Sequence, residues 1–277
     1  MTPPTLSVVV PAYNNAKYLG ETIESILRQE GIDFELIVAD HSSPDDTRSV
    51  AERYLDDPRM TLLDTPAGGG APANWRRVTE AATGEYLKLV CGDDILRPGI
   101  LARQVGLLQA SERAVLTACR RDVIDASGKT LIAGRGLQKI DRPLPGAEAV
   151  RRAVRAGINP FGEPASVTMR RDVLENVGGW FGDFPYLIDQ ASYARVLLHG
   201  DFVPDQEVGA TFRMSNEQWS VALVKNQSSQ ARGFHEWMRH HHPDVVSAAD
   251  VRIGNARAAM AARARRLAYV ALSRRMR

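Results

Sequence analysis

Four acidic residues occupy positions at which strands of an α/β protein end or helices begin. Asp40 ends one apolar run, Asp93 and Asp94 follow another, and Asp189 begins a stretch with helical spacing. Because ligands of open α/β sheets bind outside the carboxyl ends of the strands, these carboxylates are expected at one edge. Carboxylates suit a hard divalent cation, which in turn suits a diphosphate. A carboxylate can also accept the proton of an attacking hydroxyl.

Each of these signals also fits a plainer role. Gly92–Asp94 could be an ordinary turn, and Asp40 and Asp189 could cap the helices that follow them. The polar and aromatic segment Pro11–Asn15, after the first apolar run, could likewise be a plain turn. The joint placement of these residues at matching strand ends favours a binding site over separate structural roles.

Strand and helix signals alternate through the first 110 residues. β-branched and apolar runs predict buried strands, and apolar residues at helical spacing predict the helices between them. The expected strands are Leu6–Pro11, Phe34–Asp40, Met60–Asp64 and Tyr86–Val90. The expected helices are Tyr18–Gln29, a stretch from an N-cap at Ser43 or Asp45 to about Leu55, Asn74–Ala82 and Pro98–Ala110. This order predicts an α/β fold with a mixed, mainly parallel sheet wrapped by helices.

The second half of the chain is less regular. Strands are expected at Val115–Ile124, which leads to a hairpin turn at Ser127 and Gly128, at Ala165–Met169, and at Glu207–Phe212 as an edge strand. Helices are expected at Gly146–Gly157, at Asp189–His199 and from Ser220 onward, with a break near Pro243.

Composition excludes several classes of protein. Hydrophobic residues make up 44% and charged residues 25%, as in ordinary globular domains. With 35 basic and 33 acidic residues, no overall field points to nucleic acid. Two cysteines exclude a disulfide scaffold and a cysteine-rich zinc site. We find neither a signal peptide nor a membrane span, which predicts a cytoplasmic protein, at most peripheral on the cell membrane.

Four segments together resemble the inverting family 2 glycosyltransferases of the GT-A fold. They are SVVVPAYNNAKYLGETIESILRQ, FELIVADHSSPDDT, ANWRRVTEAATGEYLKLVCGDDILRPG and VGGWFGDFPYLIDQASYARVLLHGDF. The resemblance covers residues 6 to about 215. It implies transfer of a sugar from a nucleoside-diphosphate sugar, such as a UDP-sugar, to an acceptor hydroxyl, with Mn²⁺ or Mg²⁺ as cofactor. The expected products are polysaccharides, glycolipids or other surface glycans built on a glycan or lipid-linked acceptor.

The resemblance also implies roles for individual residues. Asp189 would be the catalytic base, Asp93 would approach the ribose or the metal, and Asp94 would coordinate the metal. The expected nucleotide-binding residues are Pro11, Ala12, Tyr13, Asn15, Asp40, Asn74 and Asp93. Candidate acceptor or sugar contacts are Glu163 in a loop, Trp180 in a glycine-rich loop where it could stack on a sugar, and Arg213.

The chain departs from the family pattern at three points. Cys91 stands where the family often has aspartate, so the metal would depend on Asp93 and Asp94 alone. His41 replaces a second acidic residue, which leaves selection of uridine open. Ser215 stands where many relatives carry a histidine ligand.

Two other functions remain open. A sugar nucleotidyltransferase shares the fold but should carry a basic, glycine-rich loop after the first strand, which Pro11–Lys17 is not. A non-catalytic subunit that only binds nucleotide-sugar would tolerate Cys91. Donor hydrolysis separates this subunit from the transferase.

The chain is expected to divide into two parts. Residues 1–215 would form the GT-A domain, with a nucleotide half at about 1–110 and an acceptor half at about 111–215. Residues 216–277 would form a helical extension. From Ala249 to Arg277 there are eight arginines and one acid, with Ile253, Met260, Ala264, Leu267 and Ala271 on one stripe. This tail could pack on its own domain, form a homo-oligomer contact, or lie on an anionic membrane.

Overall fold

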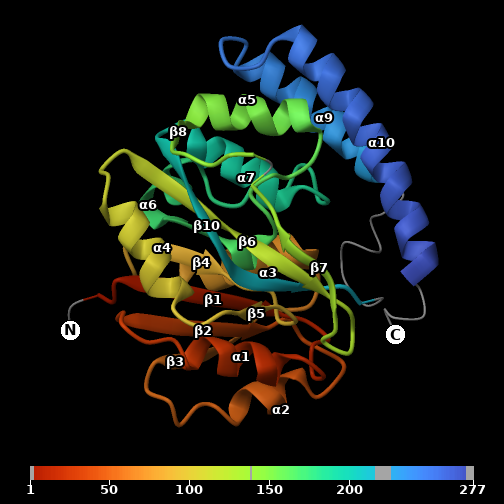
Figure 1. Ribbon diagram of the computed structural model, residues 1–277. Coiled ribbons are helices and arrows are strands. Elements are labelled where there is room, and N and C mark those ends of the chain that lie inside the picture. Colours follow the sequence, from red (N-terminus) through yellow and green to blue (C-terminus); the bar gives the residue numbers. More distant parts are fainter. Residues whose placement is uncertain (1–2, 138, 216–225, 273–277) are drawn as a thin grey trace.

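The computed structural model describes residues 3–137, 139–215 and 226–272, and the side chains of the last helix as far as Arg265. Its centre is a ten-stranded sheet with the order β3-β2-β1-β4-β9-β6-β10-β5, in which β7 pairs with β6 and β8 with β10 (Figure 1). The strands are β1 (Leu6–Ala12), β2 (Phe34–Asp40), β3 (Met60–Asp64), β4 (Tyr86–Leu89), β5 (Ile95–Leu96), β6 (Ala114–Ile124), β7 (Thr130–Arg135), β8 (Leu144–Pro145), β9 (Val167–Arg170) and β10 (Asp201–Arg213).

Six of these strands point the same way. β1 is parallel to β2 and β4, β2 is parallel to β3, and β10 is parallel to β6. β9 is antiparallel to both β4 and β6, so β4 and β6 share one direction across it. The carboxyl ends of β1, β2, β3, β4, β6 and β10 therefore meet at one edge of the sheet.

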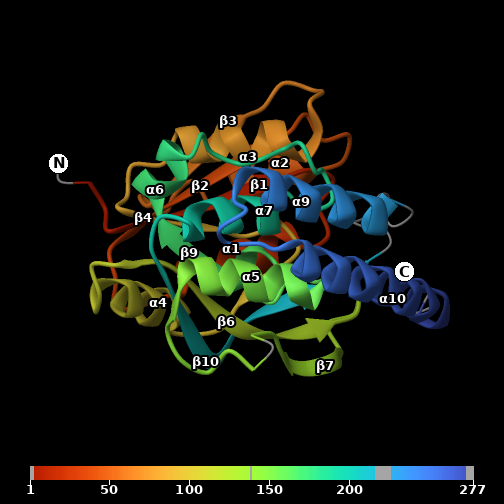
Figure 2. The same ribbon diagram turned by 90° about the horizontal axis from the view of Figure 1, so that it is seen from above.

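Helices cover both faces of the sheet. The helices are α1 (Leu19–Leu27), α2 (Thr47–Glu52), α3 (Gly70–Glu80), α4 (Ile100–Gln109), α5 (Gly146–Ala156), α6 (Arg171–Asn176), α7 (Ile188–Leu197), α9 (Gln227–His241) and α10 (Ala248–Leu272), with a short 3-10 turn at Pro164–Ser166. Alternate residues of β1 serve the two faces: Val8 and Val10 pack with α1, α2 and α4, whereas Val9 packs with α3, α5, α7 and α9. Figures 1 and 2 show α5, α9 and α10 stacked on the second face.

The predicted fold class is confirmed, and most predicted elements match, including the hairpin between β6 and β7 and the break near Pro243. Two predictions were wrong in detail. The strand expected at Glu207–Phe212 is not at the edge, because β10 runs from Asp201 and lies between β6 and the two-residue strand β5. The second helix ends at Glu52 rather than near Leu55. The predicted start of the last helical region near Ser220 lies outside the described residues.

The last helix packs on the protein through a face other than the expected stripe. Val251, Gly254, Ala258 and Ala262 are buried, whereas Met260 is 60% exposed and Ala264 faces solvent. The side chains of Leu267 and Ala271 lie outside the described part. The offset arises because α10 meets α5 through small residues, which allow a close approach of the two helices. Among the described residues, no helix is long and apolar enough to cross a membrane.

Candidate functional site

The loop that follows β1 is held in shape by the loop that follows β2. The backbone amide of Asn14, at φ 55°, donates to Ser43 Oγ at 3.0 Å, and that of Asn15 donates to Thr47 Oγ1 at 2.7 Å. Tyr13 remains 57% exposed, with its ring edge-on to His41 at a centroid distance of 6.0 Å. The loop therefore presents an aromatic ring on a backbone that is already fixed.

Asp40 lies at the end of β2 with one carboxylate oxygen available. Its Oδ2 accepts the Ser43 amide at 3.3 Å. Its Oδ1 is buried and has no hydrogen-bond partner within the described ranges. A buried carboxylate oxygen without a donor is unfavourable unless a ligand supplies one. This position suits the N–H group of a nucleobase.

Three expected nucleotide contacts are buried in this structure. Pro11 and Ala12 are buried within β1, Ala12 completely, so neither side chain can reach a base in this structure. Asn74 is 2% exposed, and its amide donates to the carbonyls of Ala12 and Ala39 and accepts from Thr65. It ties together the ends of the first two strands, which gives it a positioning role, and direct nucleotide contact by Pro11, Ala12 and Asn74 stays a prediction.

The acidic pair lies in a tight turn after β4. The Asp94 amide donates to the Cys91 carbonyl at 3.0 Å, and Asp94 Oδ1 accepts the Arg213 amide at 3.1 Å. Asp94 Oδ2 is fully buried and has no hydrogen-bond partner in the part of the chain that the structure describes. Burial, and then the charge of Asp93, raise the pKa of Asp94 well above its ordinary value. Two close carboxylates with an unsatisfied oxygen fit a hard divalent cation.

This pair would have to hold a cation without a third side chain of the usual kind. The described residues contain no group of three or more His, Cys, Asp or Glu side chains placed to hold a metal. Mg²⁺ is commonly held by one or two carboxylates together with substrate phosphates and water, so the donor diphosphate would complete the set. Desolvation, and then the charges of Asp94 and Asp93, raise the pKa of the Cys91 thiol well above its ordinary value and keep it protonated.

Asn15 connects the loop after β1 to the acidic turn. Its Oδ1 accepts the Tyr13 amide at 2.9 Å. A Cβ placed on Gly92 would lie 2.7 Å from the same oxygen, so only glycine permits this approach. Asn15 thus stands where the two loops meet, as a nucleotide-side residue would.

Arg213 supports the acidic turn through contacts within the protein, and its expected role as an acceptor contact stays a prediction. The side chain is 2% exposed and lies over the Tyr18 ring. Its Nε donates to the Asp93 carbonyl at 3.0 Å, and one terminal nitrogen pairs with Glu21 at 2.5 Å. The guanidinium is therefore occupied by the protein and holds the acidic turn in place.

Asp189 lies in the first turn of α7, facing the loop that precedes the 3-10 turn. Asn159 Nδ2 donates to Asp189 Oδ2 at 2.9 Å and also to the Gly162 carbonyl at 2.8 Å. Burial is the main cause that raises the pKa of Asp189 to about 7, and the charge of Glu163 adds to it. A carboxylate with this pKa can exchange a proton near neutral pH.

The charge of Glu163 affects both the acidic turn and Asp189. It forms an ion pair with Arg121, whose side chain is 3% exposed. Burial would raise the pKa of Glu163, but the charge and hydrogen bond of Arg121 outweigh it and lower the pKa. The charge of Glu163 acts on both Asp94 and Asp189, which places all three carboxylates in one electrostatic neighbourhood.

Trp180 is buried in this structure. The indole is 8% exposed, meets Trp75 edge-on at 4.8 Å, and its Nε1 donates to Thr79 Oγ1 at 2.8 Å. Glycines before it let the chain turn inward, and a buried indole with a satisfied N–H is a core residue. In this structure Trp180 forms a core contact between the α3 and α7 regions, and its contact with a sugar stays a prediction.

Sequence reasoning missed three residues of this site. Arg121 neutralises Glu163, Asn159 orients Asp189, and Tyr193 lies fully buried in the field of Asp189. An arginine inside an otherwise buried strand was the one signal that could have pointed to Arg121. Nothing local distinguishes Asn159 or Tyr193.

Comparison with known proteins identifies a family. The model of a family described as Glycosyl transferase family 2 matches residues 7–178. An uncharacterized protein of Mycobacterium tuberculosis is 31% identical over 210 residues, covering 73% of this chain and 66% of that protein. The GalNAc(5)-diNAcBac-PP-undecaprenol beta-1,3-glucosyltransferase of Campylobacter jejuni is 32% identical, over 49% of this chain and 44% of its own.

Solved structures show the same fold. A mannosyltransferase from Pyrobaculum calidifontis, in complex with GDP-Man and Mn²⁺, superposes with a TM-score of 0.68 at 18% identity, covering 98% of this chain and 76% of that one. TarS 1-349 of S. aureus, in complex with UDP-GlcNAc, gives 0.67 at 17% identity over 85% and 66%. The chain spans between about a third and two thirds of the length of the first curated relatives it matches.

Proposed function

Since the chain belongs to glycosyl transferase family 2, we propose that it is an inverting, metal-dependent glycosyltransferase. It would move a sugar from a nucleoside-diphosphate sugar to an acceptor hydroxyl. The observation that carries this proposal is Asp189, with a pKa of about 7, electrostatically linked through Glu163 to the acidic turn. A base and a diphosphate site are the two elements that such a transfer requires.

The donor would lie along the edge formed by β1, β2 and β4. Tyr13 would place its exposed ring against the nucleobase, and the unpartnered carboxylate oxygen of Asp40 would accept an N–H of the nucleobase. Asn15 joins this region to the acidic turn. Asp93 and Asp94 would hold Mn²⁺ or Mg²⁺, which when bound offsets the charge that develops on the leaving diphosphate.

Asp189 would accept the proton of the acceptor hydroxyl. As the acceptor oxygen bonds to the anomeric carbon, the bond from that carbon to the diphosphate breaks, and the proton passes to the carboxylate. Attack opposite the leaving group inverts the anomeric carbon. Asn159 fixes the carboxylate through Oδ2. The negative charge of Glu163, which is paired with Arg121, raises the pKa of Asp189 and so strengthens its hold on the proton it takes up.

The class of acceptor is proposed from the relatives of this chain. The Campylobacter relative carries a diphosphate-linked polyprenol in its name, and another relative is the succinoglycan biosynthesis protein ExoO of Rhizobium meliloti. We propose a role in polysaccharide, glycolipid or other surface-glycan synthesis, at the cytoplasmic face of the cell membrane. Pairing into a homo-oligomer remains a prediction.

A donor panel tests the proposed function. UDP-, dTDP- and GDP-sugars are added with Mn²⁺, and both the melting temperature and release of nucleoside diphosphate are measured. A bound donor should raise the melting temperature, because it stabilises the native state only. Stabilisation without any hydrolysis or transfer would favour a non-catalytic subunit. No response to any donor would refute the proposal.

A further inference from the structure

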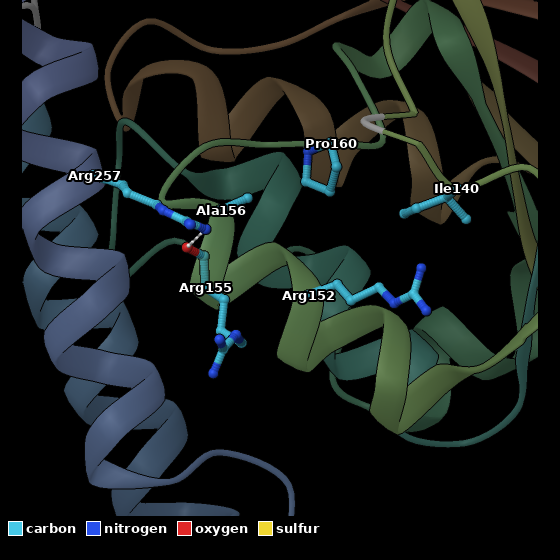
Figure 3. A pocket seen from close by; sticks show the side chains of 6 residues that line it. All are labelled: Ile140, Arg152, Arg155, Ala156, Pro160 and Arg257. Carbon is cyan, nitrogen blue, oxygen red and sulfur yellow. Dashed lines mark hydrogen bonds between the residues drawn. The ribbon is translucent and has the colours of Figure 1, made fainter.

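A hollow of about 380 Å³ lies between α5, α10 and the chain around Pro160 (Figure 3). Its lining residues are Ile140, Arg152, Arg155, Ala156, Pro160 and Arg257. Three guanidinium-bearing residues line it and no acidic residue does. Its volume falls at the lower end of the range of small-molecule sites.

Arg257 has the greatest capacity to bind a ligand here. In Figure 3 it reaches from α10 toward the last turn of α5, where its Nη1 donates to the Arg155 carbonyl at 3.0 Å. A guanidinium has five N–H donors, so one backbone carbonyl uses only part of its capacity. Among the described residues it forms no ion pair with a carboxylate. Its charge is therefore uncompensated.

The other two arginines differ in how firmly they are held. Arg152 pairs with Glu148 across one exposed helical turn at 2.5 Å, a contact that contributes little stability and can be exchanged for a ligand. Arg155 is bound more firmly, because Asp250 accepts its Nη1 at 2.6 Å. Asp250 also accepts from Arg151. The four arginines near the hollow, Arg151, Arg152, Arg155 and Arg257, therefore outnumber the two acidic residues that pair with them.

The position of Arg257 is fixed by a close helix crossing. A Cβ on Gly157 would lie 2.5 Å from the Gly254 carbonyl, and a Cβ on Gly254 would lie 2.1 Å from the Val154 carbonyl. The two glycines therefore let the end of α5 touch α10. This contact places Arg257 over the hollow before any ligand arrives, which lowers the entropy cost of binding.

The hollow backs onto the segment that holds the proposed base. Pro160 lines it, and the preceding residue, Asn159, donates to Asp189. The Pro160 carbonyl also accepts the Leu137 amide at 2.8 Å. A ligand in the hollow would thus contact the same short segment that orients Asp189.

We propose that this hollow binds the diphosphate group of a lipid-linked acceptor. Arginine matches phosphate oxygens with paired donors, and Ile140, Ala156 and Pro160 give the hollow an apolar wall beside the charge. That combination suits a phosphate joined to a hydrocarbon. The identity of the ligand rests on the proposed function, whereas the anion site itself does not.

A second hollow differs from the first because an acidic residue lines it. It is lined by Glu236, Arg239, Ala248, Val251, Arg252 and Asn255. Glu236 pairs with Arg239 at 3.0 Å, so only Arg252 adds uncompensated charge. Arg252 resembles Arg257 in being exposed on α10 and donating to a backbone carbonyl, at 3.3 Å. It therefore provides a matched control.

The test is calorimetric titration of the full chain in EDTA with inorganic pyrophosphate, farnesyl diphosphate and farnesol. Both diphosphates should bind and farnesol should not. Arg257→Gln should weaken binding of both about tenfold, as expected for loss of a charge-assisted hydrogen bond. Arg152→Gln, which leaves the contact between α5 and α10 intact, should weaken it in the same direction. Arg252→Gln and Asp94→Asn should bind like the wild type.

Three results would overturn the proposal. The first is no saturable binding of either diphosphate. The second is equal binding by the wild type, Arg152→Gln and Arg257→Gln. The third is binding of pyrophosphate without binding of farnesyl diphosphate. Donor hydrolysis by the wild type is measured separately. Its absence would refute the proposed function and leave the binding result standing, so the two failures can be told apart.

Discussion

Asp189 is expected to set the pH dependence of sugar transfer. Its ionised form is the one that can accept a proton, and its pKa is raised to about 7. The rate constant kcat/KM should therefore rise with pH up to about 7 and level off above it. Replacing Glu163 by Gln removes a negative neighbour and leaves the positive charge of Arg121 unpaired, and both changes lower the pKa of Asp189. The acid limb should then move to lower pH.

The raised pKa of Asp189 also affects the free energy of unfolding. A rise from the ordinary value of 3.8 to about 7 corresponds to about 4 kcal/mol of unfavourable ionisation, at about 1.4 kcal/mol per unit. Because Asp189 is only half-buried, solvent screening reduces this to about 1–2 kcal/mol. A raised carboxyl pKa means that stability present below about pH 4 is lost as pH rises toward 7. Asp189→Asn should therefore stabilise the fold at pH 8.

The assay combines kinetics with denaturation. Asp189→Asn should lower turnover by about 10²–10⁴-fold with donor affinity little altered. Its gain in unfolding free energy should appear at pH 8 and disappear at pH 4. Asp183→Asn, an exposed acid in the loop that precedes α7, is the control and should change neither quantity. A profile without an acid limb near pH 7, or a loss of donor affinity alone, would refute the assignment of Asp189 as the base.

Three further perturbations test other parts of the structure. Asp94→Asn should abolish the Mn²⁺-dependent rise in melting temperature with donor while leaving the fold intact, and full activity of the wild type in EDTA would contradict this. Asp250→Asn should cost about 1 kcal/mol in urea unfolding at pH 7, because the buried carboxylate loses its charge-assisted contacts with Arg151 and Arg155, which stay partly solvated. The pKa of Asp250 is held well below its usual range, since hydrogen bonds from arginine and Ser247 outweigh burial. The loss should therefore shrink as pH falls below about 4, and a pH-independent loss would argue against the ion pairs. If α10 lies on anionic membranes, Met260→Glu should reduce co-sedimentation with anionic liposomes at low salt, whereas Leu55→Glu, at an exposed position in the turn after α2, should not. Equal pelleting of both variants with anionic liposomes, or equal pelleting of the wild type with anionic and neutral liposomes, would exclude that surface.

Local patterns identified the elements of this fold because their causes are local. A run such as Leu36–Ala39 is buried on both faces, and its hydrophobicity is visible without knowing its neighbours. The position of β10 could not be read in this way. Residues Glu207–Phe212 alternate like an edge strand, yet β5, only two residues long, pairs with β10 and covers it. A strand that short carries no periodic signal.

For the site, the sequence by itself determined which groups stand at the strand ends. The acidic turn, Tyr13 and Asp40 follow directly from the ends of β1, β2 and β4, and the family resemblance added Asp189. What a side chain does there depends on partners distant in the sequence. Arg213 and Trp180 were also expected to contact the acceptor or the sugar. In the structure, the side chain of each is buried and forms hydrogen bonds within the protein.

Only the tertiary structure decided those outcomes, because burial demands a partner for every polar group and the chain supplies that partner from far away. Asn159 lies 30 residues before Asp189, and Arg121 more than 40 before Glu163, yet these pairs set the charge state of the site. The hollow beside Pro160 likewise exists because two glycines, on different helices, let α5 and α10 touch. Spacing along the chain records neither contact.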